Sequence, residues 1–210
     1  MLLGIDTCGP VGTLALAELH GEDIRLSGEA EIAGKTYAAM LMPRIRELLQ
    51  ANHASFQQIE AIVVVSGPGS FTGIRVGLST VKGLIEALNI PVIAVSRLAV
   101  LAKKAGRKCA ALDAGRGEFY FGNYSEEAHE VVLSLDELRA ACPESGLAVC
   151  EEKVAQMFPR AHVVAPPRAF DALTLAQPGL SRRDYDDPVL LDGHYLRRAD
   201  AEVKLATLKA

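Results

Sequence analysis

The sequence predicts a mixed α/β protein built of two lobes, the second repeating the plan of the first. Three observations carry this prediction: an alternating apolar pattern near the N-terminus, short runs that are almost entirely apolar, and helical spacing between those runs. We expect residues 1–100 to form the N-terminal lobe and residues 101–210 a smaller C-terminal lobe, with a basic helix at 97–108 bridging them.

The first third of the chain predicts three antiparallel strands. A short apolar run covers residues 2–6, alternation follows over 12–17, and a third stretch spans 24–32 after a polar turn. Residues 35–52 then place apolar side chains at helical spacing. Within this helix, Pro43 is expected to introduce a kink or to begin a second helix.

Two further strands are expected inside the same sheet. Residues 61–65 and 91–95 are apolar at nearly every position, which is typical of strands covered on both faces. A helix over 72–88 joins them after a glycine-rich turn. The N-terminal lobe therefore reads strand, strand, strand, helix, strand, helix, strand.

The second half starts with the same local pattern as the first. In both halves an apolar strand ends in an aspartate, Asp6 or Asp113, and a glycine-bearing turn leads into a second strand. Such self-similarity indicates an internal repeat. Beyond the strand predicted at 118–124, helix and strand are expected to alternate over residues 135–141, 147–150, 153–158, 162–165 and 168–176.

Composition limits the classes of function. The 210 residues include Lys+Arg 22 and Asp+Glu 26, and 50% of them are hydrophobic, which is typical of a soluble globular protein. A mildly acidic chain lacks the clustered basic residues that grip a nucleic acid backbone, so a role on nucleic acid would need a basic partner. No apolar run approaches a membrane span, and the N-terminal run meets Asp6 too early for a signal peptide, so we expect a cytoplasmic protein.

Neither a disulfide framework nor a metal site is predicted. The cysteines form no Cys-x-x-Cys pair, and no two histidines lie four residues apart. No Ser-His-Asp or Cys-His arrangement is visible from the spacing either. The cysteines are expected to act as small apolar residues; they are Cys8, Cys109, Cys142 and Cys150.

The strongest local signal is the glycine-rich stretch 66–77, SGPGSFTGIRVG, between a buried strand and a helix. Its glycines allow a tight turn, and Ser70 or Thr72 can cap the helix. Such a helix start favours contact with a phosphate or nucleotide, and a simple tight turn is the alternative. For Asp6 and Asp113, the alternative to binding a phosphate or nucleotide is to cap a turn. The candidate nucleotide- or anion-binding residues are Asp6, Gly67, Gly69, Ser70, Thr72 and Asp113.

Gly73 and Gly77 lie four residues apart, on one face of the predicted helix. A glycine in a helix interior costs about 1 kcal/mol relative to alanine, so a pair of them indicates a close approach by another backbone. That backbone belongs either to this chain or to a helix of another subunit. The second interpretation gives a predicted partner interface of Leu41, Ile45, Leu48, Gly73, Arg75, Val76, Gly77 and Thr80.

The chain resembles the TsaB (YeaZ) family over nearly its whole length. The resemblance rests on the strand ending at Asp6, the stretches 66–84, 90–96 and 112–120, and the Tyr-Leu-Arg motif at 195–197. It implies the duplicated actin-like ATPase (ASKHA) fold, in which two lobes each hold a mixed sheet flanked by helices.

The resemblance further implies a non-catalytic scaffold in the bacterial machinery that makes threonylcarbamoyladenosine next to the anticodon of tRNAs reading codons that begin with A. In that machinery TsaD holds a metal and transfers the threonylcarbamoyl group, and TsaE is an ATPase. We therefore expect a heterodimer with a TsaD homologue, a homodimer in its absence, contact with TsaE, and tRNA reached through the complex. ATP-Mg and the metal belong to the partner subunits, and no cofactor is expected on this chain alone.

Departures from the related sequences are informative. Where TsaD has a His-x-x-x-His metal motif, residues 96–101 read SRLAVL, so both imidazoles are missing and a pseudo-enzyme is indicated. Tyr37 stands where the TsaB family commonly has a histidine, so a role assigned to that histidine does not transfer. Four basic residues near the C-terminus either contact phosphate groups or are simply solvated charges; they are Arg197, Arg198, Lys204 and Lys209.

Two other functions remain as alternatives. An ATP-dependent phosphotransferase would use Asp6 and Asp113 in a cleft between the lobes, but Pro10 removes an amide donor from the turn that would hold the phosphates. A glycopeptidase-like protein would need a nucleophile and base, or a metal site, and the sequence offers neither.

Overall fold

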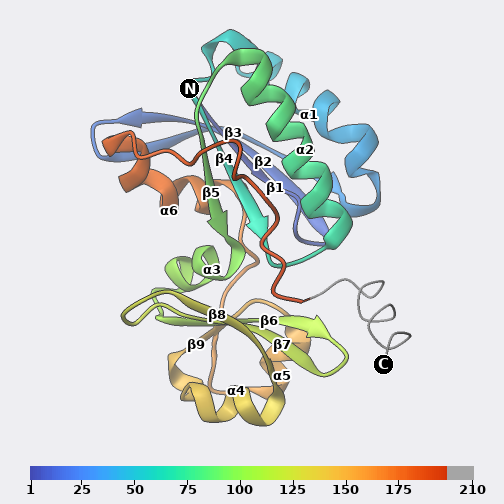
Figure 1. Cartoon of the computed structure of the whole chain (residues 1–210), viewed down its shortest axis with the longest axis vertical. Coiled ribbons are helices and arrows are strands. Elements are labelled where there is room, and N and C mark those ends of the chain that lie inside the picture. Colours follow the sequence, from blue (N-terminus) through green and yellow to red (C-terminus); the bar gives the residue numbers. More distant parts are fainter. Residues whose placement is uncertain (198–210) are drawn as a thin grey trace.

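Each half of the chain builds a five-stranded mixed sheet (Figure 1). The computed structural model describes residues 1–197. The elements are β1 (Leu2–Asp6), β2 (Val11–His20), β3 (Asp23–Ala33), α1 (Tyr37–Ala51), β4 (Ala61–Gly67), α2 (Phe71–Leu88), β5 (Val92–Ser96), α3 (Arg97–Ala105), β6 (Cys109–Gly115), β7 (Glu118–Asn123), β8 (His129–Ser134), α4 (Leu135–Ala141), β9 (Leu147–Val149), α5 (Glu152–Met157), β10 (His162–Val163) and α6 (Ala169–Arg182).

The first sheet has the strand order β3-β2-β1-β4-β5. The three N-terminal strands form the predicted antiparallel meander, and β4 and β5 add to it in parallel. Strand β4 is buried at every position, as its apolar sequence predicts for an interior strand. The same prediction is wrong for β5, which lies at the edge. That edge is partly covered, because Asp186 donates its backbone N–H to Val92 O at 3.0 Å and accepts from Ala94 N at 2.6 Å.

Helix α1 continues unbroken through Pro43. Of the two alternatives expected for Pro43, a kink or the start of a second helix, the second is therefore wrong. Pro43 lies on the exposed side of α1, while Leu41 and Ile45 on either side of it are buried. Burial of that apolar face holds the helix together although the proline removes one backbone hydrogen bond.

The second sheet repeats the first. Its order is β10-β9-β6-β7-β8, so β6, β7 and β8 match the meander of the first sheet, and β9 and β10 match β4 and β5. The pairing directions also agree, antiparallel within the meander and parallel beyond it. The predicted duplicated fold of two mixed sheets flanked by helices is confirmed. Strand β8 was not predicted; it is a partly exposed edge strand with no long apolar run.

The helices that follow the two sheets change places. Helix α3, which follows β5, packs on β6, β7 and β9 of the second sheet while also contacting β4 and β5, and α6, which follows β10, packs on all five strands of the first sheet. Figure 1 shows α6 beside the first sheet and α3 between the sheets. Assigning all of residues 101–210 to the C-terminal lobe is thus wrong for α6, because its apolar face completes the core of the first sheet.

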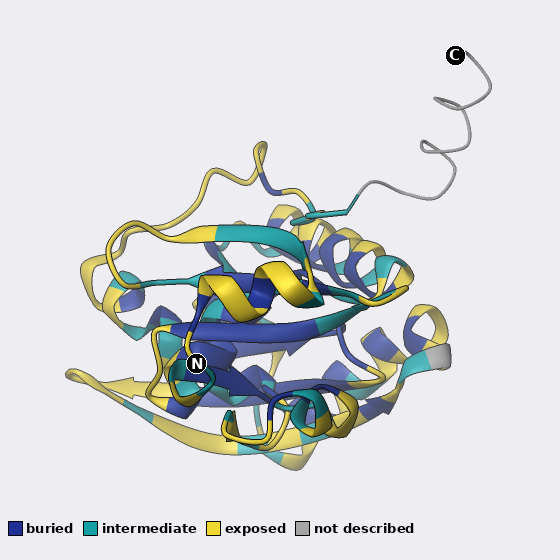
Figure 2. Cartoon of the chain, turned by 90° about the horizontal axis from the view of Figure 1, so that it is seen from below, coloured by how far each residue is buried: buried dark blue, intermediate teal, exposed yellow. Residues whose placement is uncertain are grey.

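Burial follows this arrangement. Figure 2 shows the buried residues concentrated in the sheets and on the helix faces turned toward them. Gly4 on β1 lets α6 lie close, since a Cβ at this position would stand 2.7 Å from Ala169 O and 3.0 Å from Leu173 Cγ. No helix within residues 1–197 is long and apolar enough to cross a bilayer.

Candidate functional site

A cavity of about 670 Å³ lies between the two sheets. The turn after β1 and the start of α2 form its wall on the first sheet, and the end of β6 with the residue before α5 forms its wall on the second. Pro10 lies in the first wall. Because proline has no backbone N–H, this position offers no amide donor to the cavity. Arg97, the first residue of α3, completes the lining.

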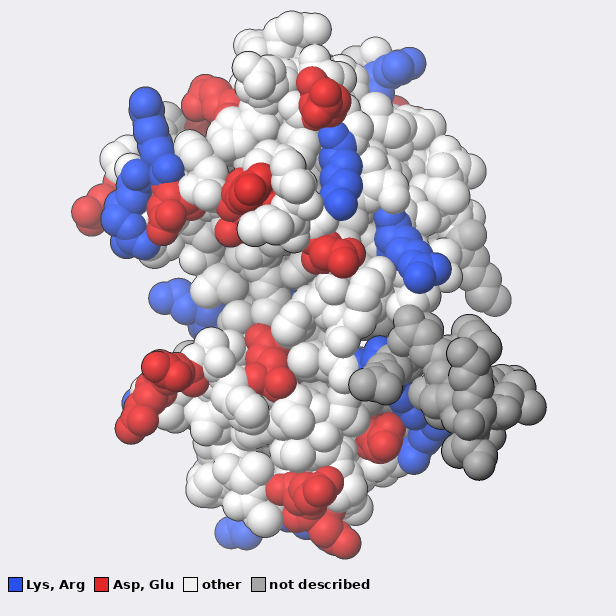
Figure 3. Space-filling model, viewed as in Figure 1, with Lys and Arg blue, Asp and Glu red and all other residues white. Residues whose placement is uncertain are grey.

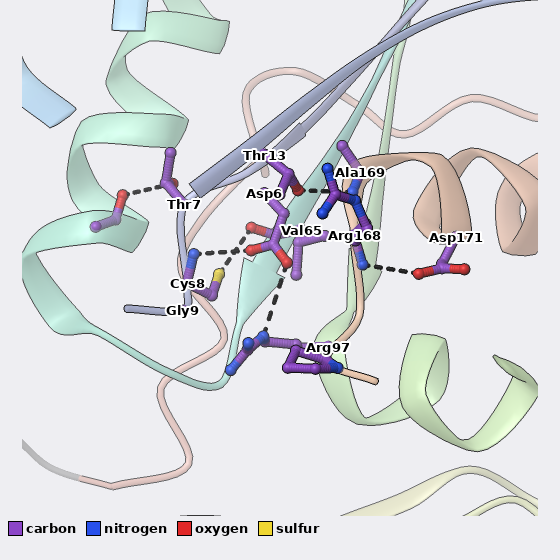
Figure 4. Close-up of polar contacts among 12 residues, drawn as sticks. Asp6, Thr7, Cys8, Gly9, Thr13, Val65, Arg97, Arg168, Ala169 and Asp171 are labelled. Carbon is purple, nitrogen blue, oxygen red and sulfur yellow. Dashed lines mark hydrogen bonds and ion pairs between the residues drawn. The ribbon is translucent and has the colours of Figure 1, made fainter. Parts of the chain in front are cut away.

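Asp6 and Arg97 form a buried ion pair at the first wall (Figure 4). Their side chains are 2% and 7% exposed, and Arg97 Nε lies 3.7 Å from Asp6 Oδ2. The other carboxylate oxygen, Oδ1, accepts a hydrogen bond from Cys8 N at 2.8 Å. Burial raises the pKa of Asp6, and the positive charge of Arg97 and the Cys8 amide only partly offset that effect.

The start of α2 is fastened to the turn after β1. Ser70 N donates to Cys8 O at 2.8 Å, and the Ser70 hydroxyl caps the helix by accepting from Gly73 N at 3.2 Å. Gly69 has a φ of 158° and lies so close to Cys8 O that a side chain would collide with it. The glycine-rich stretch thus brings the first turn of α2 to the cavity.

The second wall carries two carboxylates that have their own donors. Asp113 Oδ1 accepts from Gly115 N at 2.8 Å, and its Oδ2 pairs with Lys153 Nζ at 2.8 Å. The hydrogen bond from Lys153 is the main cause of the lowered pKa of Asp113. Glu151 Oε2 accepts from Asp113 N at 2.6 Å, and burial raises the pKa of Glu151.

The structure brings together part of the predicted anion-binding set. Gly69, Ser70 and Asp113 line the cavity, and Asp6 lies next to them behind Cys8 and Arg97. Two members of the set, Gly67 and Thr72, do not line the cavity. A Cβ on Gly67 would meet His194 O at 2.8 Å, and Thr72 is exposed.

Sequence reasoning missed Arg97 and Glu151 as parts of this site. The one available signal for Arg97 was a charged residue opening an otherwise apolar helical turn directly after a strand. Its burial depends on Asp6, which is distant in sequence. Glu151 gave no comparable signal.

Most of the predicted partner interface is internal. Leu41, Ile45 and Leu48 are buried in the core of the first sheet. Gly73 and Gly77 are buried against Thr7, whose hydroxyl donates to Gly73 O at 2.7 Å and whose atoms leave no room for a Cβ at either glycine. The close approach therefore comes from this chain, and these five residues are removed from the interface. The remaining three, Arg75, Val76 and Thr80, are exposed or half-buried.

Tyr37 anchors α1 to the same turn. Its hydroxyl donates to Gly9 O at 2.8 Å, and its ring lies against Gly12 and Gly73. Burial raises the pKa of Tyr37 to about 12, so it stays a neutral donor at physiological pH. Tyr37 thus has a structural role in this chain.

A C-terminal strap, residues 186–197, crosses from the first sheet to the second. His194 N donates to Ser66 O at 2.8 Å, while the His194 ring pairs with Glu130 of β8 at 2.8 Å. Tyr195 packs on Phe71 of α2 with ring centroids 4.7 Å apart. Arg197 donates to Ala114 O at 2.7 Å and pairs with Glu118, so its charge is engaged within the chain. Arg198, Lys204 and Lys209 lie outside the described residues.

Metal-ligating side chains do not gather in this site. Within residues 1–197, no group of three or more His, Cys, Asp or Glu side chains is arranged to hold a metal ion.

Comparison with known proteins gives a consistent set of relatives. The sequence model of the TsaD family, tRNA N6-adenosine threonylcarbamoyltransferase, matches residues 30–160. The tRNA threonylcarbamoyladenosine biosynthesis protein TsaB of Escherichia coli is 30% identical over 136 residues, 62% of this chain and 57% of that protein. TsaB of Bacillus subtilis is 38% identical over 128 residues, 59% of this chain and 54% of that protein. The chain thus matches little more than half the length of these two curated relatives.

A solved structure extends the match to almost the whole chain. YeaZ from Pseudomonas aeruginosa superposes with a TM-score of 0.71 at 29% identity, covering 93% of this chain and 99% of that one. The likeness therefore includes both sheets.

Proposed function

Because this chain belongs to the TsaB (YeaZ) family, we propose that it is a non-catalytic subunit supporting the formation of threonylcarbamoyladenosine in tRNA. The observation that carries the proposal is the family match, which includes curated TsaB proteins named for that biosynthesis. A TsaD homologue would be the partner that performs the transfer, TsaE the ATPase that joins them, and tRNA would bind through the complex in the cytoplasm.

The ion pair at the wall of the cavity supports a non-catalytic role. Arg97 falls within residues 96–101, where the family resemblance places the metal-binding histidines of TsaD. Its guanidinium faces Asp6 at 3.7 Å, so a fixed positive charge already neutralises the carboxylate at the end of β1. A guanidinium cannot act as a Lewis acid or as a general base, because it has no open coordination position and stays protonated.

The direct test is threonylcarbamoyladenosine formation on tRNA. The cognate TsaD and TsaE, with the enzyme that makes threonylcarbamoyl-adenylate, are assayed with and without this chain. We expect sustained modification only when this chain is present, and none from this chain alone. Equal rates with and without it would contradict the proposal.

The outward faces of α1 and α2 are the proposed docking surface for TsaD. The two helices pack side by side on the first sheet. Figure 3 shows charged side chains of both signs scattered over this face, and the exposed residues of α2 include Arg75, Lys82 and Glu86. Met42 on α1 is 39% exposed, and Gly83 on α2 has no atom within 4 Å of a virtual Cβ. Two neighbouring exposed helices of this kind can pack against helices of a partner, including a homodimer when TsaD is absent.

Gly83→Arg tests this surface without touching the core. The added side chain enters open space, so the chain should fold normally while its affinity for the TsaD homologue falls at least tenfold in calorimetry. Ala140→Arg, on the exposed side of α4 in the second lobe, is the matched control and should leave affinity unchanged. Wild-type affinity in the Gly83 variant would exclude this face.

A further inference from the structure

Arg97 is a buried cation with one unsatisfied donor. Its side chain is only 7% exposed, and Nε has no hydrogen-bond partner within the described part of the chain. The 3.7 Å separation from Asp6 Oδ2 permits an ion pair but is too long for a hydrogen bond. A guanidinium carries five N–H donors, and leaving a buried charged group without hydrogen bonds is costly. A hydrogen-bond acceptor placed beside this group would therefore stabilise it.

The guanidinium forms part of the wall of the 670 Å³ cavity. A virtual Cβ on Gly9 would lie 2.7 Å from Arg97 Nη2, so the tip of the side chain lies directly against the Gly9 backbone in that wall. Ser70, the N-cap of the 18-residue helix α2, lines the same cavity. The start of a helix carries a partial positive charge and free amides, which adds to the charge of Arg97.

The carboxylates around the cavity already have donors. Cys8 N binds Asp6, Gly115 N and Lys153 bind Asp113, and Asp113 N binds Glu151. None of these carboxylates is within hydrogen-bonding distance of Arg97 Nε. These carboxylates thus leave Arg97 Nε without an acceptor, and the guanidinium is not tied to any of them by a hydrogen bond.

We propose that this cavity binds a small oxyanion, a carboxylate or phosphate group, through the Arg97 guanidinium. Arginine binds both groups with two parallel hydrogen bonds, which its planar fork favours over other geometries. The volume is typical of pockets for small ligands, and Leu112 and Tyr120 supply less polar wall for the rest of a small anionic molecule. This inference is independent of the proposed role in tRNA modification, because binding needs only this chain.

The test is a titration of the full-length chain with inorganic phosphate and, separately, with acetate. Binding is followed by amide chemical shifts at constant ionic strength, with chloride as the reference anion. We expect saturable shifts at Gly9 and Ser70 with at least one of the two anions, and the one that saturates identifies the preferred group. Saturation with neither anion would overturn the proposal.

Two variants should move the affinity in opposite directions. Arg97→Lys keeps the charge but loses the planar fork, so affinity should fall at least tenfold. Asp6→Asn removes the competing negative charge and keeps an acceptor for Cys8 N, so affinity should rise severalfold. Arg46→Gln, on the exposed face of α1, is the control and should bind as wild type.

A further variant protects the test against misfolding. The double variant Asp6→Asn, Arg97→Gln removes both charges together and avoids leaving one of them buried alone. It should fold and fail to bind either anion. Wild-type affinity in this double variant, or in Arg97→Lys, would contradict the assignment to Arg97.

Discussion

Two glycines on α2 show how far the role of a residue depends on its surroundings. A Cβ on Gly77 would collide with Thr7 Oγ1, whereas a Cβ on Gly83 would meet nothing within 4 Å. Both lie in the regular part of the helix. Only Gly77 is therefore needed for packing.

We predict that alanine at these two positions has opposite effects. Gly77→Ala should destabilise the fold by about 1–3 kcal/mol, because the methyl group forces Thr7 and the turn after β1 to move. Gly83→Ala should stabilise it by about 0.5–1 kcal/mol, because alanine loses less conformational freedom in a helix. Urea unfolding of the two variants measures both. Changes of the same sign would contradict the prediction.

At the level of single residues, the sequence identified one member of the buried ion pair and missed the other. Asp6 is recognisable because it ends an apolar strand before a turn, and that signal is local. Arg97 is 91 positions further along the chain and is buried only because β5 and α3 bring it back to Asp6. A pairing of this kind is set by tertiary packing and leaves no periodic pattern in the sequence.

Helix α6 is the element that completes the hydrophobic core of the first sheet. Leu173 is fully buried and faces Gly4 of β1, whereas Leu175 on the same helix is half-buried. The fit of α6 on β1 rests on this pairing of a large and a small residue.

Truncating these two leucines should have unequal costs. Leu173→Ala is expected to lower the free energy of unfolding by about 2–5 kcal/mol, since it leaves a cavity between α6 and β1. Leu175→Ala removes the same atoms from a partly solvated site and should cost less than half as much. Thermal and urea unfolding provide the comparison. Equal losses would show that α6 does not seat on the sheet through Leu173.

The elements differ in how well they could be predicted. Strands β1, β2 and β4 and helix α2 have strong local patterns, so their type and approximate limits follow from the sequence. Three features did not follow: the partly exposed strand β8, the edge position of β5, and the packing of α6 on the first sheet. Each of these depends on which segments meet in space, which periodicity alone does not specify.

Across the whole molecule, the C-terminal strap ties the two sheets together through a titratable contact. The His194 ring pairs with Glu130 of β8, and Tyr124 also donates to Glu130, while the His194 backbone binds Ser66. The hydrogen bond to Glu130 raises the pKa of His194. Burial alone would raise the pKa of Glu130, but hydrogen bonds from His194, Ser96 and Tyr124 outweigh it and lower that pKa.

We predict that this contact stabilises the fold most between about pH 4.5 and 6.5, the ordinary pKa values of the two groups. The raised pKa of His194 means that its contribution is complete below pH 6.5 and is lost as the pH rises through the folded-state value. The lowered pKa of Glu130 means that its contribution is lost only as the pH falls below 4.5.

His194→Gln checks this dependence. Its stability deficit relative to wild type should be larger at pH 6 than at pH 8.5 in urea unfolding. His162→Gln, at an exposed position on β10, is the control and should show no such change with pH. A deficit for His194→Gln that is the same at both pH values would contradict the prediction.

The exchange of α3 and α6 between the sheets also determines when the protein can fold during its synthesis. Domains generally fold from the N-terminus as they leave the ribosome. Here all five strands of the first sheet have emerged by Ser96, yet the helix that covers one of its faces ends at Arg182. While nearly ninety further codons are translated, α6 is not yet available to cover that face. The nascent chain thus leaves an apolar face of the first sheet without its covering helix until α6 has been synthesised.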